Sequence, residues 1–439
     1  MRRLVPALVA AGLLVTPAAA QADASGADST DALTAGQKSP YVVVLKDSIG
    51  STDATTDDVG RRGGFIARLR YAAAIKGFAA DLTPAQVAFI SALPVVDFVQ
   101  PDVTMAAAGQ MTAPASGETV TPGVRRIGAA TATSVRASGG APVAVLDSGI
   151  DLANPDLDAR QGTNCIKPGT PAADDNGHGT HVAGIIGARN GGTGVVGVAP
   201  ATPVYSVKIL GSNGTGTLSQ FLCGIDWVTA NAASLGIKVA NMSIGGAGST
   251  DTSCGAANKD AEHKAICRSV AAGITFVVAA GNSKTDFART VPAAYPEVLT
   301  VTAMSDGDGL PGAKLNPACV SGEADDRYGS YSNYASGSAA VAHTIAAPGT
   351  CIVSTGKGGG TATYVGTSQA APHVAGAVAL CVGSAGAPGP CAGLAPAAIM
   401  QRVRNDAMAA ATTVNGFVGD LLRPFSARGY GPLVNAAAY

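Results

Sequence analysis

Two short apolar runs constrain the fold of this chain most strongly, because each one ends in a polar side chain beside a glycine. Residues Val143–Leu146 lead into Asp147, and residues Phe276–Ala280 lead through one glycine into Asn282. A short, uninterrupted run of β-branched and small apolar residues is typical of a strand buried on both faces of a parallel sheet. Catalytic and binding groups collect beyond the carboxyl ends of such strands, so Asp147 and Asn282 are candidate site residues.

Helical segments alternate with the buried runs along the chain, for example at residues 218–233 and 371–382. This alternation indicates an α/β fold in which a doubly wound, mostly parallel sheet carries helices on both faces. Residues 121–439 are long enough for one large domain of this kind, and we assign them to it.

A serine stands where the second helical segment begins. Ser368 follows Gly366 and precedes a run of small residues that has Pro372 near its start. The N-terminus of a helix tolerates proline and leaves backbone N–H groups free. A serine hydroxyl becomes a nucleophile when a histidine takes its proton and a carboxylate orients that histidine. His178, which opens a run rich in glycine and alanine, and Asp147 are the candidates for these two roles.

Each of these residues also has a structural alternative. Asp147 could cap a turn, and Asn282 could be a turn residue instead of an amide donor to a developing oxyanion. His178 and His181 are three residues apart, so they could share one helix face as a metal pair. No third ligand follows them at the spacing of a metal site, which favours the catalytic interpretation of His178.

The order Asp, His, Ser and the residues around each one resemble the subtilisin-like serine proteases, or subtilases. The similar blocks are Asp147–Asp151, His178–Gly184, Ala279–Asn282 and Gly366–Ser368. The proteinase K-like and bacterial extracellular members are the most similar. The resemblance implies a serine endopeptidase that works through an acyl-enzyme, with Asp147, His178 and Ser368 as its triad, Asn282 as its oxyanion donor, and no cofactor for the chemistry.

The resemblance also implies a cleft that holds a polypeptide substrate as an added strand between two glycine-containing segments, Lys208–Gly216 and Asn241–Gly246. The substrate-binding residues carried over are Leu210, Gly211, Gly216, Ser243, Ile244, Gly245, Ala279 and Gly281. These wall segments contain no Asp or Glu, so we expect a broad specificity with an apolar preference before the cut. The alternative is that both segments are ordinary glycine loops.

The N-terminal region predicts export and a separate module. Residues 1–20 have the charged start, apolar stretch and small-residue end of a signal peptide, which implies a secreted, extracellular protein. Residues 21–38 are small and polar, which is typical of a disordered linker. Residues 106–120 are rich in Ala, Gly, Thr and Pro and suit a cleavable linker.

Residues 39–105 are predicted to form a small α+β module. Strands are expected at 41–45, 75–82 and 95–102, and a helix is expected to begin at Pro84 with Thr83 as its cap. The module resembles the inhibitory propeptide of the same family. This resemblance implies a self-processed zymogen whose own propeptide is an intramolecular inhibitor. The alternative is an independent binding domain that the mature protein keeps.

The cysteine count and the net charge limit the compartment and the binding partners that we expect for this chain. The eight cysteines favour an oxidising compartment with up to four disulfides, and sequence proximity suggests the pairs Cys254–Cys267 and Cys381–Cys391. The formal net charge of −1 gives no electrostatic argument for nucleic acid or membrane binding. We expect a monomer.

Structural calcium is compatible with the resemblance, but we assign no residue to a metal. The family's calcium loop here reads Asn190–Gly194, whose glycines offer only main-chain oxygens, although Asp156 is present. An acidic insertion at 306–326 could bind a hard cation through its carboxylates, and the favoured alternative is a solvated acidic loop. The acidic residues are Asp306, Asp308, Glu323, Asp325 and Asp326.

Two other functions would leave a different pattern in the sequence. A catalytically silent binding protein on the same fold would be expected to lack a triad residue, and none is missing. A lipase or esterase would need a Gly-x-Ser-x-Gly motif and the order Ser, Asp, His, and this chain has neither.

Overall fold

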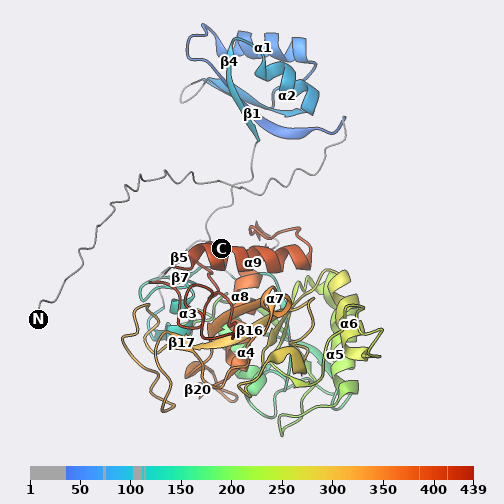
Figure 1. Cartoon of the computed structure of the whole chain (residues 1–439), viewed down its shortest axis with the longest axis vertical. Helices are drawn as coiled ribbons and strands as arrows, with labels where there is room; N and C mark the ends of the chain where they lie inside the picture. The colour runs from blue at the N-terminus through green and yellow to red at the C-terminus, as the bar shows by residue number, and fades with distance from the viewer. Residues whose placement is uncertain are drawn as a thin grey trace, which may run out of the picture. The chain divides into compact units, whose positions relative to one another are not determined.

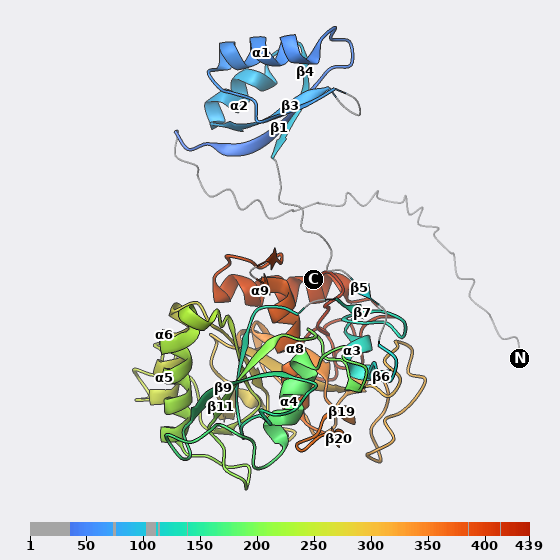
Figure 2. The ribbon, with the colours of Figure 1, turned by 180° about the vertical axis from the view of Figure 1, so that it is seen from behind.

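The computed structural model describes residues 36–72, 76–101, 111–112, 115–137, 139–384, 386–412 and 414–439. The predicted signal peptide, most of the segment 21–38, residues 73–75 and 102–105 of the predicted module, and residues 106–110, 113 and 114 of the predicted linker lie outside the described residues. Two compact units divide the chain between Met105 and Ala106. Figures 1 and 2 show both units from opposite sides.

The first unit is an antiparallel sheet of order β2-β3-β1-β4 with two helices. Its elements are β1 (Ser39–Leu45), α1 (Thr52–Gly63), β2 (Leu69–Tyr71), β3 (Gly77–Leu82), α2 (Pro84–Ser91) and β4 (Val96–Pro101). Val43 and Leu45 alternate with more exposed neighbours and share one core with both helices. The predicted start of α2 is confirmed, since the Thr83 hydroxyl accepts from the Gln86 N–H and the Gln86 side chain accepts from the Thr83 N–H.

The second unit is built on an eight-stranded sheet of order β17-β16-β14-β12-β8-β11-β9, with β18 paired to β16. All pairs are parallel except β16 with the short β17. The strands are β8 (Val143–Asp147), β9 (Asp158–Asn164), β11 (Pro203–Lys208), β12 (Val239–Met242), β14 (Thr275–Ala279), β16 (Leu299–Ser305), β17 (Arg327–Tyr328) and β18 (Thr344–Pro348). The predicted mostly parallel sheet is confirmed.

Helices cover both faces of this sheet, as predicted. The main ones are α4 (His178–Gly187), α5 (Leu218–Leu235), α6 (Ala261–Ala271), α8 (Thr367–Val382) and α9 (Pro396–Ala410). Figures 1 and 2 show α5 and α6 together on one side and α4, α8 and α9 on the other. Because side chains alternate along a strand, Val143 and Val145 of β8 join the core with α4 and α8, whereas Ala144 and Leu146 join the core with α5 and α6.

Short elements complete the second unit. They are β5 (Met111–Thr112), β6 (Glu118–Thr119), α3 (Pro122–Arg126), β7 (Val135–Arg136), β10 (Gly194–Val195), β13 (Gly246–Ala247), η1 (Phe287–Arg289), β15 (Thr290–Val291), α7 (Ser338–Val341), β19 (Ile352–Thr355), β20 (Thr361–Tyr364), β21 (Gly383–Ser384) and β22 (Ala387–Pro388). No helix among the described residues is long and apolar enough to cross a membrane.

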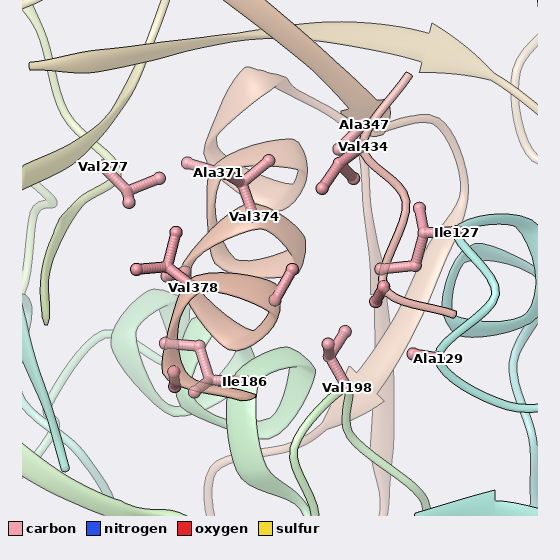
Figure 3. Packing of buried hydrophobic residues seen from close by; sticks show 14 of the residues in the cluster. Ile127, Ala129, Ile186, Val198, Val277, Ala347, Ala371, Val374, Val378 and Val434 are labelled. Atoms are coloured by element: carbon pink, nitrogen blue, oxygen red, sulfur yellow. The ribbon is translucent and has the colours of Figure 1, made fainter. Parts of the chain in front are cut away.

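Helix α8 is buried along almost its whole length. Figure 3 shows Ala371, Val374 and Val378 enclosed by side chains from other elements, including Val277 and Ile186. The helix begins at Thr367, four residues before the predicted start, because Gly366 caps it and accepts the N–H of Gln369. Pro372 is therefore an interior residue of the helix and not a residue of its first turn.

Four disulfides cross-link the second unit. Cys254–Cys267 and Cys381–Cys391 are the pairs that sequence proximity suggested, and both are present. Cys165–Cys223 joins the end of β9 to α5, and Cys319–Cys351 joins the 306–326 insertion to the loop before β19. These two pairs link residues far apart in sequence, which is why spacing alone could not assign them.

The expectation of a solvated acidic loop at 306–326 is wrong. Asp306, Asp325 and Asp326 are at most 4% exposed. Their carboxylates accept backbone N–H groups of the insertion itself, and the fully buried Arg126 pairs with Asp306 at 2.8 Å and with Asp326 at 2.6 Å. Burial raises the pKa of Asp306 to about 7, while the Gly309 N–H and Arg126 act in the opposite direction.

We predict that Arg126→Ala destabilises the protein by about 3–5 kcal/mol, because the variant leaves buried carboxylates without their cation. Every protein compared in the unfolding measurement also carries the substitution Ser368→Ala. Arg125→Ala is the matched control, because Arg125 is only partly buried, and we expect it to change stability by about 0.5 kcal/mol or less. Equal effects of the two substitutions would contradict the structural role of Arg126.

Candidate active site

The end of β8 and the start of α4 bring a carboxylate and an imidazole together. Asp147 is fully buried, and its two carboxylate oxygens lie 2.8 Å and 3.0 Å from His178 Nδ1. Helix α4 can approach this closely because position 179 is glycine: a Cβ there would lie 2.0 Å from the Gly149 carbonyl oxygen and 3.2 Å from Asp147 Oδ1. The contact fixes the ring and leaves Nε2 as the nitrogen available for proton transfer.

Two opposing effects set the pKa of His178. Burial lowers it, but the charge of Asp147 and its hydrogen bond act in the other direction, with a smaller contribution from Asp174. The net pKa of His178 is raised above its ordinary value.

Ser368 is tied to the strand segment across the cleft by two reciprocal hydrogen bonds. The Ser368 hydroxyl donates to the Ser243 carbonyl at 3.0 Å, and the Ser243 hydroxyl donates to the Ser368 carbonyl at 2.8 Å. The second bond is possible because Pro372 has no N–H to donate to the carbonyl four residues earlier. The interior proline thus frees Ser368 for this clamp.

Ser368 and His178 line the same cavity, of about 400 Å³. Among the described residues, the Ser368 hydroxyl donates to Ser243 and not to His178. The side-chain nitrogen of the residue after Ser368, Gln369 Nε2, lies 3.5 Å from His178 Nε2. Proton transfer from Ser368 to His178 therefore requires the hydroxyl to rotate, which is common in unliganded sites.

Two potential oxyanion donors converge beside Gly366. Asn282 Oδ1 accepts from both the backbone N–H and the hydroxyl of Thr367, which leaves the amide nitrogen free to donate. A Cβ placed on Gly366 would lie 3.2 Å from Asn282 Nδ2 and 3.6 Å from the Ser368 backbone nitrogen. Both nitrogens therefore border one small volume next to the candidate nucleophile, which Gln369 Oε1 also borders at 3.1 Å from the same position.

Asn333 supports this arrangement, although no local sequence motif indicates this role. The side chain is 1% exposed. Its Oδ1 accepts the N–H groups of Ser283 and Thr285, and its Nδ2 donates to the Ala280 carbonyl and to Thr290 Oγ1. One buried amide therefore holds the loop that carries Asn282.

The predicted substrate-binding residues border two cavities on either side of Ile244, Gly245 and Ser368. The first, of about 420 Å³, is also lined by Ala279, Gly281 and Asn282. The second is the cavity of about 400 Å³, which is also lined by Leu210, Gly216 and Ser243, and by Phe221, which the sequence analysis did not single out. Gly211 lines neither cavity, and its N–H donates to the Thr215 carbonyl in the neighbouring turn.

His181 is held in the core. The residue is fully buried, and its Nε2 lies 3.0 Å from the Ile352 carbonyl oxygen and 3.1 Å from that of Ala362. Burial lowers its pKa to about 4. In the part of the chain that the structure describes, neither group of potential metal ligands includes His178 or His181.

Another group of polar side chains lies at the 190–194 loop, away from Asp147, His178 and Ser368. Glu118 Oε1 accepts the N–H groups of Gly191, Gly192 and Thr193. Glu118 Oε2 and both Asp156 carboxylate oxygens are buried and make no well-formed hydrogen bond among the described residues, although the backbone N–H groups of Val195 and Arg189 lie near enough to lower the pKa of Asp156. Burial, followed by the charge of Glu118, raises the pKa of Asp156 to about 6. Unpartnered carboxylate oxygens of this kind fit a hard cation such as calcium.

The fold is similar to that of a solved protein, a cold-adapted subtilisin-like serine proteinase. The match covers 72% of this chain and 98% of the other, with a TM-score of 0.52 and 27% identity. The model of the subtilase family matches residues 138–427, and that of the peptidase inhibitor I9 family matches residues 40–108. The chain belongs to the subtilase family, with an inhibitor I9 propeptide module before the peptidase domain.

Curated relatives agree with this assignment. Subtilisin of Bacillus pumilus is 39% identical over 171 residues, which is 38% of this chain and 57% of the relative. The alkaline protease of Shouchella clausii is 34% identical over 225 residues, which is 51% of this chain and 53% of the relative. The minor extracellular protease Epr of Bacillus subtilis is 38% identical over 38% of this chain and 24% of its own length. The matched parts thus span about a quarter to somewhat over half of these relatives.

We predict that His178→Ala lowers the turnover number by several orders of magnitude, as expected when a triad member is lost. His181→Ala is the comparison, and it should lower the melting temperature while a folded fraction keeps its turnover number. Steady-state kinetics on folded protein, quantified by absorbance and checked by circular dichroism, would separate the two effects. Complete loss of activity in both well-folded variants would contradict the assignment of the base.

The raised pKa of His178 predicts the acidic limit of activity. Below that pKa the imidazole carries a proton and cannot accept another, so activity falls as pH decreases through it. The midpoint of the acidic limb of kcat/KM should lie above the ordinary histidine value of about 6.5. A pH profile measured where the protein stays folded tests this, and a midpoint well below that value would contradict the dominance of Asp147.

Proposed function

We propose that the protein is a secreted serine endopeptidase that hydrolyses peptide bonds through an Asp147–His178–Ser368 triad. The observation that carries the proposal is the contact of 2.8 Å between His178 Nδ1 and the buried Asp147, with Ser368 lining the same cavity as His178. Family membership supports the same reaction class.

The proposed reaction has two steps. Ser368 Oγ attacks the substrate carbonyl carbon while His178 Nε2 takes the hydroxyl proton and then gives it to the leaving amine. Asp147 holds the imidazole in the required tautomer and balances its positive charge. Asn282 Nδ2 and the Ser368 N–H stabilise the oxyanion. Water then hydrolyses the acyl-enzyme with His178 as the base, and no cofactor takes part in the chemistry.

Specificity is the second part of the proposal. The substrate lies between the two cavities as an added strand, with the residue before the cut in the cavity beside Asn282. The side chains of Ile244 and Ala279 form an apolar wall, and the cavity beside Asn282 therefore accepts medium and large apolar side chains. The cavity with Leu210 and Phe221 takes a further apolar side chain upstream in the substrate.

The third part of the proposal concerns maturation and location. The I9 module acts as an intramolecular inhibitor until the chain cuts itself within residues 106–120. The mature enzyme is an extracellular monomer. The signal-like start of the sequence, the four disulfides and the extracellular protease among its relatives support this location.

Structural calcium is the fourth part. We infer that Glu118 and Asp156 hold a calcium ion together with main-chain oxygens of the 190–194 loop. The unpartnered carboxylate oxygens support this assignment. The ion would offset their charge and stabilise the loop without taking part in the chemistry.

We predict that Ser368→Ala abolishes peptidase activity and leaves the propeptide attached, because the same nucleophile performs both cleavages. Casein hydrolysis and the N-terminal sequence of the product, expressed in a protease-deficient host, would test this. The variant appearing at mature size would contradict self-processing, and retained casein hydrolysis would contradict the nucleophile.

Chelation should lower the melting temperature of the wild-type protein. An ion at hundredfold excess over its dissociation constant contributes about 2.7 kcal/mol of stability. Asp156→Asn should lose most of this response, whereas Asp158→Asn, a more exposed neighbour that pairs with Arg160, should keep it. Thermal melts in calcium and in chelator provide the comparison. The same response in wild type and Asp156→Asn would place the ion elsewhere.

A further inference from the structure

We propose that Arg289 gives charge selectivity to the pocket that binds the substrate residue before the cut. Among polar substrate side chains, this pocket favours glutamate and disfavours lysine. This inference rests on the proposed peptidase function. It adds charge selection to the apolar contacts of the pocket walls.

The pocket carries a positive charge that is not neutralised. Arg289 lines the cavity of about 420 Å³ that Asn282 and Ser368 also line. None of the described residues lining that cavity is acidic, and Arg289 is its single charged side chain. Arg289 is exposed, and its side chain makes no hydrogen bond or ion pair among the residues that the structure describes. The nearby Asp286 uses Oδ1 to cap the Ala288 N–H.

The backbone around Arg289 is fixed, so its side chain starts from a defined place. Arg289 ends η1, and its carbonyl accepts the N–H of Gly248 at 3.1 Å. The next two residues form β15, which pairs antiparallel with β13 of the cleft segment, Ala247 opposite Thr290. The arginine is therefore anchored to the same short ribbon that forms one wall of the pocket.

A second donor faces the pocket next to Arg289. Thr290 also lines the cavity, and its Oγ1 accepts a hydrogen bond from Asn333 Nδ2 at 3.3 Å. Because that oxygen is an acceptor there, the hydroxyl hydrogen is free to donate to a ligand. A guanidinium and a hydroxyl in one pocket match an acceptor group such as a carboxylate or a carboxamide.

The second cavity does not share this chemistry. Its outer lining includes the apolar side chains of Leu210 and Phe221, and it contains neither Arg289 nor another arginine or lysine among its described lining residues. Charge selection should consequently act on the residue directly before the cut and not on residues further upstream.

Glutamate suits the first cavity by length as well as by charge. Its two methylene groups can lie along Ile244 and Ala279 while its carboxylate meets the two donors. Glutamine has the same shape without the charge, so the comparison of the two isolates the electrostatic contribution. For partly solvated charges about 4–6 Å apart we expect a difference of about five- to tenfold in kcat/KM between them.

The test uses p-nitroanilide peptides that differ only in the residue before the scissile bond, namely Leu, Glu, Gln and Lys. In the wild-type enzyme at low salt, kcat/KM should decrease in the order Glu, Gln, Lys. Arg289→Gln should remove the advantage of Glu over Gln, and Arg289→Glu should make Lys better than Glu. The rate on the uncharged Leu peptide is the reference to which the other rates of each enzyme are normalised.

The matched control is Lys284→Gln, which removes an exposed positive charge five residues away that does not line the cavity. It should keep the wild-type order. An equal change in Lys284→Gln and Arg289→Gln would assign the effect to overall charge and overturn the inference. Equal cleavage of the Glu and Lys peptides by the wild-type enzyme would also overturn it. Failure to cleave any peptide, including Leu, would instead contradict the proposed function.

Discussion

Burial of α8 against the sheet is the constraint on which the rest of the candidate site depends. The helix packs on β12, β14, β16 and β18, and α4 lies beside it in the same core. Its first turn carries Ser368, and the first turn of α4 carries His178. The packing of each helix in the core therefore fixes the position and orientation of the polar residue in its first turn. Pro372 adds a local effect, since it frees the Ser368 carbonyl to hold Ser243.

Much of this arrangement could be predicted from local sequence. Asp147 terminates a buried strand, and His178 begins a glycine-rich helix, because apolar runs and glycine turns mark where elements end. The cap at Thr83 and the two short-range disulfides were equally local. The start of α8 was predicted four residues late, since Gly366 in front of a proline-containing segment gives conflicting signals.

What the sequence could not predict depends on contacts between distant residues. Asn333 acts on a loop some fifty positions earlier, as its bond to Ser283 shows. Arg126 reaches acidic residues about two hundred positions later, which turned a predicted solvated loop into a buried one. Glu118 meets the 190–194 loop through backbone N–H groups that no side-chain motif reveals. The identities of the triad residues remain predictions that the geometry supports.

The central claim is that Ser368 is a nucleophile activated by His178. It is tested most directly by incubating the purified, processed protein with a fluorophosphonate and mapping the modified peptide by mass spectrometry. We expect a single phosphonylated residue, Ser368, and at least a hundredfold slower labelling in His178→Ala, roughly the smallest effect of losing a positioned base. Labelling of another residue, or equal rates in the two proteins, would contradict it.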